Sequence, residues 1–178
     1  MSRKNNAAKQ NYTGGVSMKY LLITLITITG LMATPDEFNV NSSMLNGQYF
    51  FETIPTINGA DIDSLDWLGA FKDDICVGAQ LWNANQCGGG ICSIQVMGDD
   101  GSELTNGYME ENEIPTFKIY DTSDSTYYDA IASGSTLIST VTDTICEGVV
   151  PNCMEFEHFL FVQIQSLQSS GEGSCDGY

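Results

Sequence analysis

The sequence has little positive charge and almost no histidine. Its 178 residues include six Lys and Arg, 23 Asp and Glu, and one His, for a formal net charge of −17. A chain this acidic repels phosphate backbones, which argues against a nucleic-acid-binding protein. With one histidine, a two-His metal centre is excluded, and a His-based catalytic dyad or triad would have to use His158.

The usual marks of an enzyme are also missing. His158 lies in an apolar run, residues 156–162, that reads as a late strand in which it is a core or edge residue. No Gly-x-Ser-x-Gly motif accompanies it. Glycoside hydrolysis needs two carboxyl groups at a set separation, and nothing in the sequence marks such a pair. We therefore expect a protein without catalytic activity.

The few bases are concentrated at the N-terminus. Residues 1–33 hold four of the six Lys and Arg, no acid, and a short apolar run at 20–28. A positive start, a short apolar stretch and small residues near Ala33 are typical of a secretory signal. The run is too short to cross a bilayer. The alternative is a buried strand, because Ile and Thr favour extended chain. The pattern predicts a secreted, extracellular or cell-surface protein with no membrane span after the leader.

Removing this leader leaves a strongly acidic remainder. Residues 34–178 contain two bases, Lys72 and Lys118, against all 23 acids, so their formal charge is 2 minus 23, or −21. Repulsion on this scale disfavours compaction. We expect bound cations, covalent cross-links or both to offset it.

All of the cysteines follow the leader, and they are Cys76, Cys87, Cys92, Cys146, Cys153 and Cys175. An even number behind an export signal predicts disulfides in an oxidising compartment. Two pairs can close short local loops, Cys87 with Cys92 across three glycines and Cys146 with Cys153, which leaves Cys76 and Cys175 to pair. Zinc binding is the alternative, but the C-x₂-C spacing of zinc ribbons and fingers is absent.

From residue 38 onward, short β-rich runs alternate with turn residues. Expected strands are 48–54, 67–71, 75–82, 91–97, 115–120, 126–132, 136–142 and 156–164. Turn signals stand at Asn46-Gly47, Asn58-Gly59 and Asn106-Gly107. The pattern predicts an all-β protein, a disulfide-stapled antiparallel β-sandwich of jelly-roll or Ig-like type. We expect a leader at 1–33, an N-terminal arm at 34–46, the sandwich at 47–167 and a polar tail at 168–178.

An ordered set of motifs spans much of this region. The motifs are Trp67-Leu-Gly-Ala-Phe71, Cys76-Val-Gly-Ala79, Gly98-Asp-Asp-Gly101, Gly107-Tyr108 and Pro115-Thr-Phe-Lys-Ile-Tyr-Asp121. Their order resembles a β-sandwich module of secreted and cell-surface proteins from environmental bacteria, some of which look like subunits of extracellular filaments. The resemblance covers about residues 38–128 and implies a structural role at the cell surface.

The motif residues also lead to expectations on physical grounds. Gly69 and Gly78 stand inside expected strands, where glycine marks a bulge or a close backbone approach. We expect Trp67, Phe71, Phe117 and Ile119 to face the core. Lys118 falls on the opposite face of its strand from Phe117 and Ile119, where we expect it to pair with a nearby acid.

The acidic turns suggest a cation site. Asp99, Asp100 and Glu103 place three carboxylates on one loop, and calcium prefers oxygen ligands on flexible loops. The alternative is a solvated turn whose Asp side chains cap backbone amides. The twelve-residue EF-hand pattern is absent. Calcium is therefore the expected cofactor, if there is one.

Two features suggest contact with glycans. Aromatic residues with a polar edge suit sugar stacking, although core packing is the alternative, and the candidates are Trp67, Trp82, Tyr49, Tyr108, Tyr127 and Tyr128. Asn41-Ser42-Ser43 is an N-glycosylation sequon.

The arm suggests self-assembly. Phe38 and Val40 are spaced by two, as on one face of a strand. Donated to the open sheet edge of a neighbour, such an arm generates a head-to-tail filament of identical subunits. The alternative is an intramolecular first strand. The sequence thus predicts a structural subunit of an extracellular filament or surface assembly. The alternative function is a monomeric carbohydrate- or surface-binding module.

Overall fold

The computed structural model describes residues 34–83, 85, 87, 92–138 and 154–170. Within these residues the regular structure is β, apart from one 3-10 turn, η1 (Asp36–Phe38). The all-β prediction is confirmed. The leader, the Cys146–Cys153 pair, Cys175 and most of the expected tail lie outside the described residues.

Nine strands of the described chain form one sheet. They are β1 (Asn46–Phe51), β2 (Thr56–Ile57), β3 (Ala60–Asp61), β4 (Trp67–Lys72), β5 (Ile75–Leu81), β6 (Cys92–Met97), β7 (Thr116–Asp121), β8 (Thr126–Leu137) and β9 (Phe161–Ser169). Hydrogen bonding runs in the order β5-β4-β7-β8-β9-β1-β6, and the β2–β3 hairpin joins the far end of β9.

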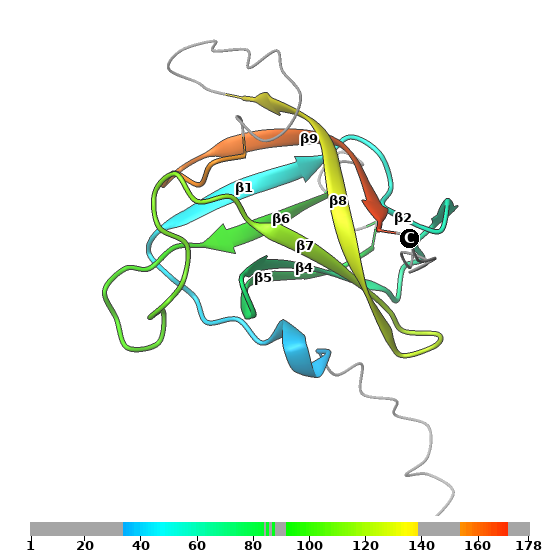
Figure 1. Cartoon of the computed structure of the whole chain (residues 1–178), viewed down its shortest axis with the longest axis horizontal. Helices are drawn as coiled ribbons and strands as arrows, with labels where there is room; N and C mark the ends of the chain where they lie inside the picture. Colours follow the sequence, from blue (N-terminus) through cyan, green and yellow to red (C-terminus); the bar gives the residue numbers. More distant parts are fainter. Residues whose placement is uncertain (1–33, 84, 86, 88–91, 139–153, 171–178) are drawn as a thin grey trace, which may run out of the picture. The chain divides into compact units, whose positions relative to one another are not determined.

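The sheet is mixed, because β9 pairs in parallel with both β1 and β2 while the other pairs are antiparallel. Figure 1 shows β9, β1 and β6 together on one side of the domain and β7, β4 and β5 on the other, with the long β8 running from the first group to the second. The two end strands, β5 and β6, come into contact without pairing. The sheet therefore curls around one interior.

Alternating side chains fill that interior. In β1 the buried positions are Gly47, Tyr49 and Phe51, as the two-residue period of a strand requires. Ile94 of β6 and Val162 of β9 are fully buried beside them. The Tyr49 hydroxyl donates to the Met154 carbonyl oxygen at 3.0 Å, so its polar end is satisfied. Burial raises the pKa of this phenol well above its usual value.

Most expected strands are found within a few residues of their predicted limits. Asn58-Gly59 forms the expected turn between β2 and β3, with φ of 51° and 82°. Asn46-Gly47 begins β1 instead of forming a turn, because Gly47 is buried there against Leu160 and Phe156.

Two further differences concern β8 and β9. The strands expected at 126–132 and 136–142 share one continuous β8, which passes through Gly134 with φ of 66°. β9 starts later than expected and continues through Ser169, two residues into the segment predicted as tail.

Candidate functional site

The motif glycines mark two close approaches. A Cβ on Gly78 of β5 would collide with the backbone carbonyl oxygen of Gln95 in β6, where the ends of the sheet meet. A Cβ on Gly69 of β4 would lie 2.8 Å from Cε1 of Phe38. The expectation of close backbone approach is confirmed at Gly78, whereas at Gly69 the close neighbours are phenyl rings.

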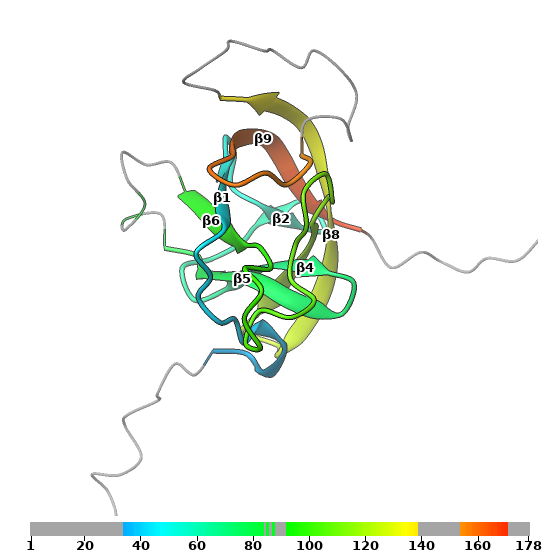
Figure 2. The same cartoon turned by 90° about the vertical axis from the view of Figure 1, so that its left-hand side faces the viewer.

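The second approach belongs to a small apolar cluster on the outer face of the sheet. Phe38, Phe71 and Cys76 are buried there, and Trp67, Ala79, Tyr120 and Tyr127 pack around them. Phe117 and Ile119 face the interior as predicted, but Trp67 and Phe71 do not. Their strand buries both faces, because η1 covers the outer one with Phe38. The turn lies beside β5 in Figure 2.

The N-terminal arm thus packs on its own domain. Phe38 is 1% exposed, and Val40 is half-buried between the outer cluster and the interior. Before Asn46, where β1 begins, the arm belongs to no strand of the described chain.

Lys118 pairs with an acid as predicted, and that acid comes from the arm. Its Nζ lies 3.0 Å from Oε2 of Glu37 and 4.8 Å from the centroid of the Phe71 ring. The other described lysine, Lys72, lies 2.8 Å from Oε2 of Glu113 and donates to the Tyr108 carbonyl oxygen. The hydrogen bond with Glu113 raises the pKa of Lys72 despite partial desolvation.

The acidic loop uses its first two carboxylates as internal acceptors. Asp99 accepts the backbone N–H groups of Gly101 and Gly107. Asp100 accepts from the Thr105 hydroxyl at 2.7 Å, from the Ser102 N–H at 3.1 Å and from the Met44 N–H at 3.1 Å. These donors, with Thr105 first, lower the pKa of Asp100 well below its usual range.

Among the described residues, no group of three or more His, Cys, Asp or Glu side chains is arranged to hold a metal ion. Glu103 is exposed and lines a shallow hollow together with Asp99, Gly101, Ser102 and Asn106. Calcium binding by Asp99, Asp100 and Glu103 stays a prediction.

Asp66, directly before the Trp67 motif, is a further structural carboxylate. It is 5% exposed and accepts the N–H groups of Asp63 at 2.8 Å and Thr122 at 3.0 Å. Burial raises its pKa, and the two N–H donors partly offset that effect. It ties the loop before β4 to the loop after β7.

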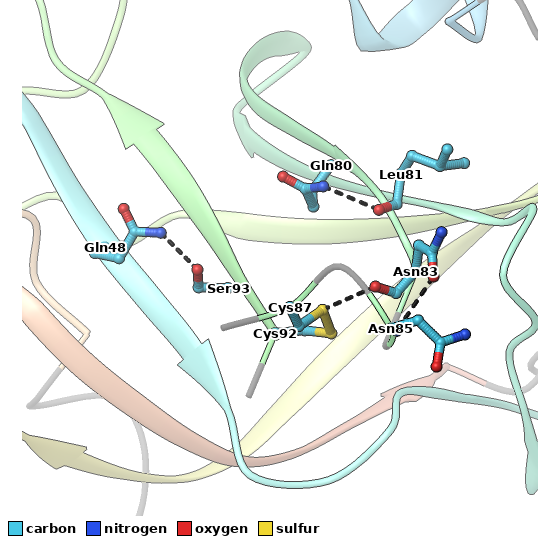
Figure 3. Close-up of a disulfide and its surroundings, with 8 residues drawn as sticks. All are labelled: Gln48, Gln80, Leu81, Asn83, Asn85, Cys87, Cys92 and Ser93. Atoms are coloured by element: carbon cyan, nitrogen blue, oxygen red, sulfur yellow. Dashed lines mark hydrogen bonds between the residues drawn. A yellow bond between two sulfur atoms is a disulfide. The ribbon is translucent and has the colours of Figure 1, made fainter. Parts of the chain in front are cut away.

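The cysteines confirm one predicted bridge. Cys87 and Cys92 form a disulfide, with their Cα atoms 4.7 Å apart (Figure 3). Cys76 is a free thiol buried in the outer cluster, and its expected partner, Cys175, lies outside the described residues. Burial raises the pKa of Cys76 to about 11, so the thiol stays protonated at neutral pH.

The aromatic residues expected to stack on sugars are mostly covered. Tyr49, Trp82 and Tyr108 lie in the interior. Trp67 and Tyr127 pack in the outer cluster, and the Tyr128 hydroxyl donates to Asp124. Core packing, the alternative drawn from the sequence, therefore accounts for most of these rings.

Two other residues singled out in the sequence, the lone histidine and the sequon asparagine, are on the surface. His158 is exposed before β9, where Nδ1 accepts the Asn46 N–H at 3.2 Å. Asn41 is exposed, and its side-chain amide donates to the Leu104 carbonyl oxygen at 3.0 Å. Glycosylation of Asn41 stays a prediction.

The motifs that carry the resemblance therefore contribute to the scaffold. The candidate binding surface lies elsewhere, on three strands without charged residues. β6, β1 and β9 are neighbours in the sheet, and none of the three contains Asp, Glu, Lys or Arg. Their side chains directed away from the interior include amides, a hydroxyl and two phenyl rings. We call this set the neutral face: Gln48, Phe50, Ser93, Gln95, Phe161 and Gln163.

The neutral face has an aromatic centre with polar neighbours. The rings of Phe50 and Phe161 are stacked, with centroids 6.3 Å apart and planes 17° apart. Phe161 is 41% exposed. Beside them the Gln48 amide donates to the Ser93 hydroxyl at 2.6 Å, as drawn in Figure 3.

Sequence reasoning missed this surface, although a signal was available. The runs 46–51, 92–97 and 161–169 are free of charge in a chain with 23 acids. The sequence does not show that these runs are adjacent, because they are far apart along the chain.

Comparison with known proteins found no matching family model, no matching curated protein and no matching solved structure. A search of the described residues for a helix long and apolar enough to cross a membrane also found none.

Proposed function

We propose that this chain is a non-catalytic binding module that holds a neutral polysaccharide on the neutral face. The single observation that carries the proposal is the absence of charge from three adjacent strands of a highly acidic chain. The monomeric binding module was the alternative drawn from the sequence, and the packing of the arm favours it over strand donation.

The chemistry of the face suits sugar rings. Sugars present C–H faces that stack on aromatic rings and hydroxyl groups that bind amides, and Phe161, Gln95 and Gln163 offer both kinds of contact. Phe50 supports Phe161 from the side. No charged group of these strands needs desolvation when a neutral chain binds.

The surrounding charge adds selectivity. Residues 34–178 carry all 23 acidic residues, so an anionic polysaccharide is repelled before it reaches the face. A neutral polymer experiences no such repulsion.

Donation of Phe38 and Val40 as a strand is less well supported. Phe38 is buried against Gly69 and Phe71, and an arm paired as an edge strand of a neighbour would not place Phe38 in these contacts. Size exclusion of the folded protein, with and without Ca²⁺, tests the filament alternative. Polymeric species would support it, and a monomer would not.

The test is affinity electrophoresis in gels containing soluble neutral or anionic polysaccharides. We expect retardation in neutral gels that 0.5 M salt leaves unchanged, because no ion pair contributes. Phe161→Ala should weaken retention about five- to tenfold, the loss of one aromatic contact worth about 1 kcal/mol. Gln163→Glu should weaken it as well.

Ile75→Ala is the matched control. Ile75 is also 41% exposed but lies on β5, outside the neutral face. Equal loss in both Ala variants, or no retention of the parent protein by any neutral polysaccharide, would reject the proposal.

A further inference from the structure

The place where the arm rests is built entirely by the folded sheet. We call it the socket: Gly69 and Phe71 of β4, Lys118 and Tyr120 of β7, and Tyr127 of β8. Phe38 enters it with ring centroids 5.6 Å from Phe71, 6.5 Å from Tyr120 and 5.7 Å from Tyr127. None of these groups belongs to the arm, so the socket is complete without it.

Around Phe38 the arm is held by side-chain packing, one ion pair and one hydrogen bond, and it forms no strand before Asn46. Besides Phe38, its links to the socket are the Glu37–Lys118 pair and a 3.4 Å hydrogen bond from the Glu37 N–H to the Tyr127 hydroxyl. β1 begins only at Asn46. The segment between them is attached at three residues. The Asn41 N–H donates to the Tyr108 hydroxyl at 2.7 Å, and its side-chain amide donates to the Leu104 carbonyl oxygen. The Met44 N–H donates to Asp100, and the Leu45 carbonyl oxygen accepts the Gly98 N–H at 2.7 Å.

The contacts in the socket are ring packing around Phe38, the Glu37–Lys118 ion pair and the hydrogen bond from the Glu37 N–H to the Tyr127 hydroxyl. A second copy of the arm can therefore make the same contacts, since none requires the arm and the sheet to be in one chain. Exchange of an identical element is a low-cost route to assembly, because it replaces each intramolecular contact with an equal intermolecular one.

Charge favours an arm as the incoming group. Lys118 is one of two lysines in residues 34–178, and the other is engaged by Glu113 and Glu110. The arm carries Asp36 and Glu37 directly before Phe38. On a surface that otherwise repels acids, an acidic segment is attracted to the socket.

We propose that the arm of a second copy occupies the socket in place of the resident arm. Reciprocal exchange closes into a dimer, and one-way exchange continues head-to-tail. The contact differs from strand donation, because Phe38 inserts as a single aromatic side chain and adds no strand to the sheet. The inference concerns a different surface from the neutral face and does not depend on sugar binding.

A charge-swap pair tests it with full-length, folded protein. In Glu37→Lys the arm and the socket are both basic, and in Lys118→Glu both are acidic. In each variant alone, residue 37 of any arm meets residue 118 of any socket with a charge of the same sign, within a chain or between chains. In an exchanged heterodimer of the two variants, both of these contacts join opposite charges.

The measurement is native mass spectrometry of the two variants, one of them isotope-labelled, after incubation at high concentration. We expect a heterodimer at least about fivefold more abundant than either homodimer, and dimers or larger species of the parent protein that increase with concentration. Melting curves establish that both variants are folded.

The Phe38→Ala variant allows a second measurement, because its socket lacks the phenyl ring that fills it in the parent protein. A labelled peptide spanning residues 34–43 should bind this variant, and the same peptide with Phe38→Ala should not. A parent protein that stays monomeric at every concentration, together with a monomeric mixture, would overturn the proposal even if the peptide bound.

Discussion

The ring of Phe38 lies over the bare backbone of Gly69, and a Cβ at that glycine would come within 2.8 Å of the ring. The two residues are 31 positions apart, in the arm and in β4. The glycine of the Trp-Leu-Gly-Ala-Phe motif is thus explained by the residue that packs on it.

We expect Gly69→Ala to destabilise the domain by about 1–3 kcal/mol, because the added methyl group meets the rings of Phe38 and Phe71. The measurement is urea unfolding monitored by fluorescence. If the destabilisation by Gly69→Ala arises from its clash with the Phe38 ring, it should be smaller in a Phe38→Ala background, since the two residues are in contact. A fully additive double variant would show that the methyl group acts elsewhere.

Removing the Cys87–Cys92 disulfide with Cys87→Ser should cost about 2 kcal/mol, as expected for cross-linking so short a loop. Cys92→Ser should cost more, because Cys92 is 3% exposed in the interior and its replacement buries a hydroxyl. Chemical denaturation with and without reductant measures both. Equal stability of the oxidised and reduced parent protein would contradict the expectation.

Asp100 should make stability depend on acid pH. Its folded-state pKa lies below the unfolded value of about 3.9, so its contribution is present above that value and is lost as pH falls through and below it. The melting temperature of the parent protein should therefore fall below about pH 4. Asp100→Asn should melt lower than the parent at pH 7, and the difference should narrow at pH 3. A difference independent of pH would show that the charge of Asp100 is not involved.

Calcium binding can be tested on the same loop. If Asp99, Asp100 and Glu103 hold Ca²⁺, the ion should raise the melting temperature relative to chelator, because a ligand of the folded state stabilises it by RT ln(1 + [L]/Kd). Glu103→Gln should reduce the shift without affecting stability in chelator, since Glu103 is exposed. Identical melting curves in millimolar Ca²⁺ and in chelator would reject this site.

The scaffold was predictable where local patterns are strong. The strands around Tyr49, Ile94 and Phe117 follow the alternation that a half-buried strand shows. The Cys87–Cys92 bridge and the Asn58-Gly59 turn are also local, because their partners are a few residues apart. Lys118 was placed on the outer face by the same alternation.

Other features depend on partners that are distant in sequence. Trp67 and Phe71 read as interior residues because the pattern cannot reveal that η1 covers the opposite face of β4. Asp99 and Asp100 read as cation ligands because their backbone donors, Gly107 and Met44 among them, are brought to them only by the folded loop.

The sequence by itself determined the all-β class, most strand positions, one disulfide and the excess of negative charge. Those properties follow from residue type, from spacing along the chain and from short-range geometry. The tertiary structure decided that β6, β1 and β9 lie together as an uncharged face and that Phe38 fills a socket on β4, β7 and β8. Sheet order and packing of the arm are set by contacts between residues far apart in the chain, which a pattern in one segment does not encode.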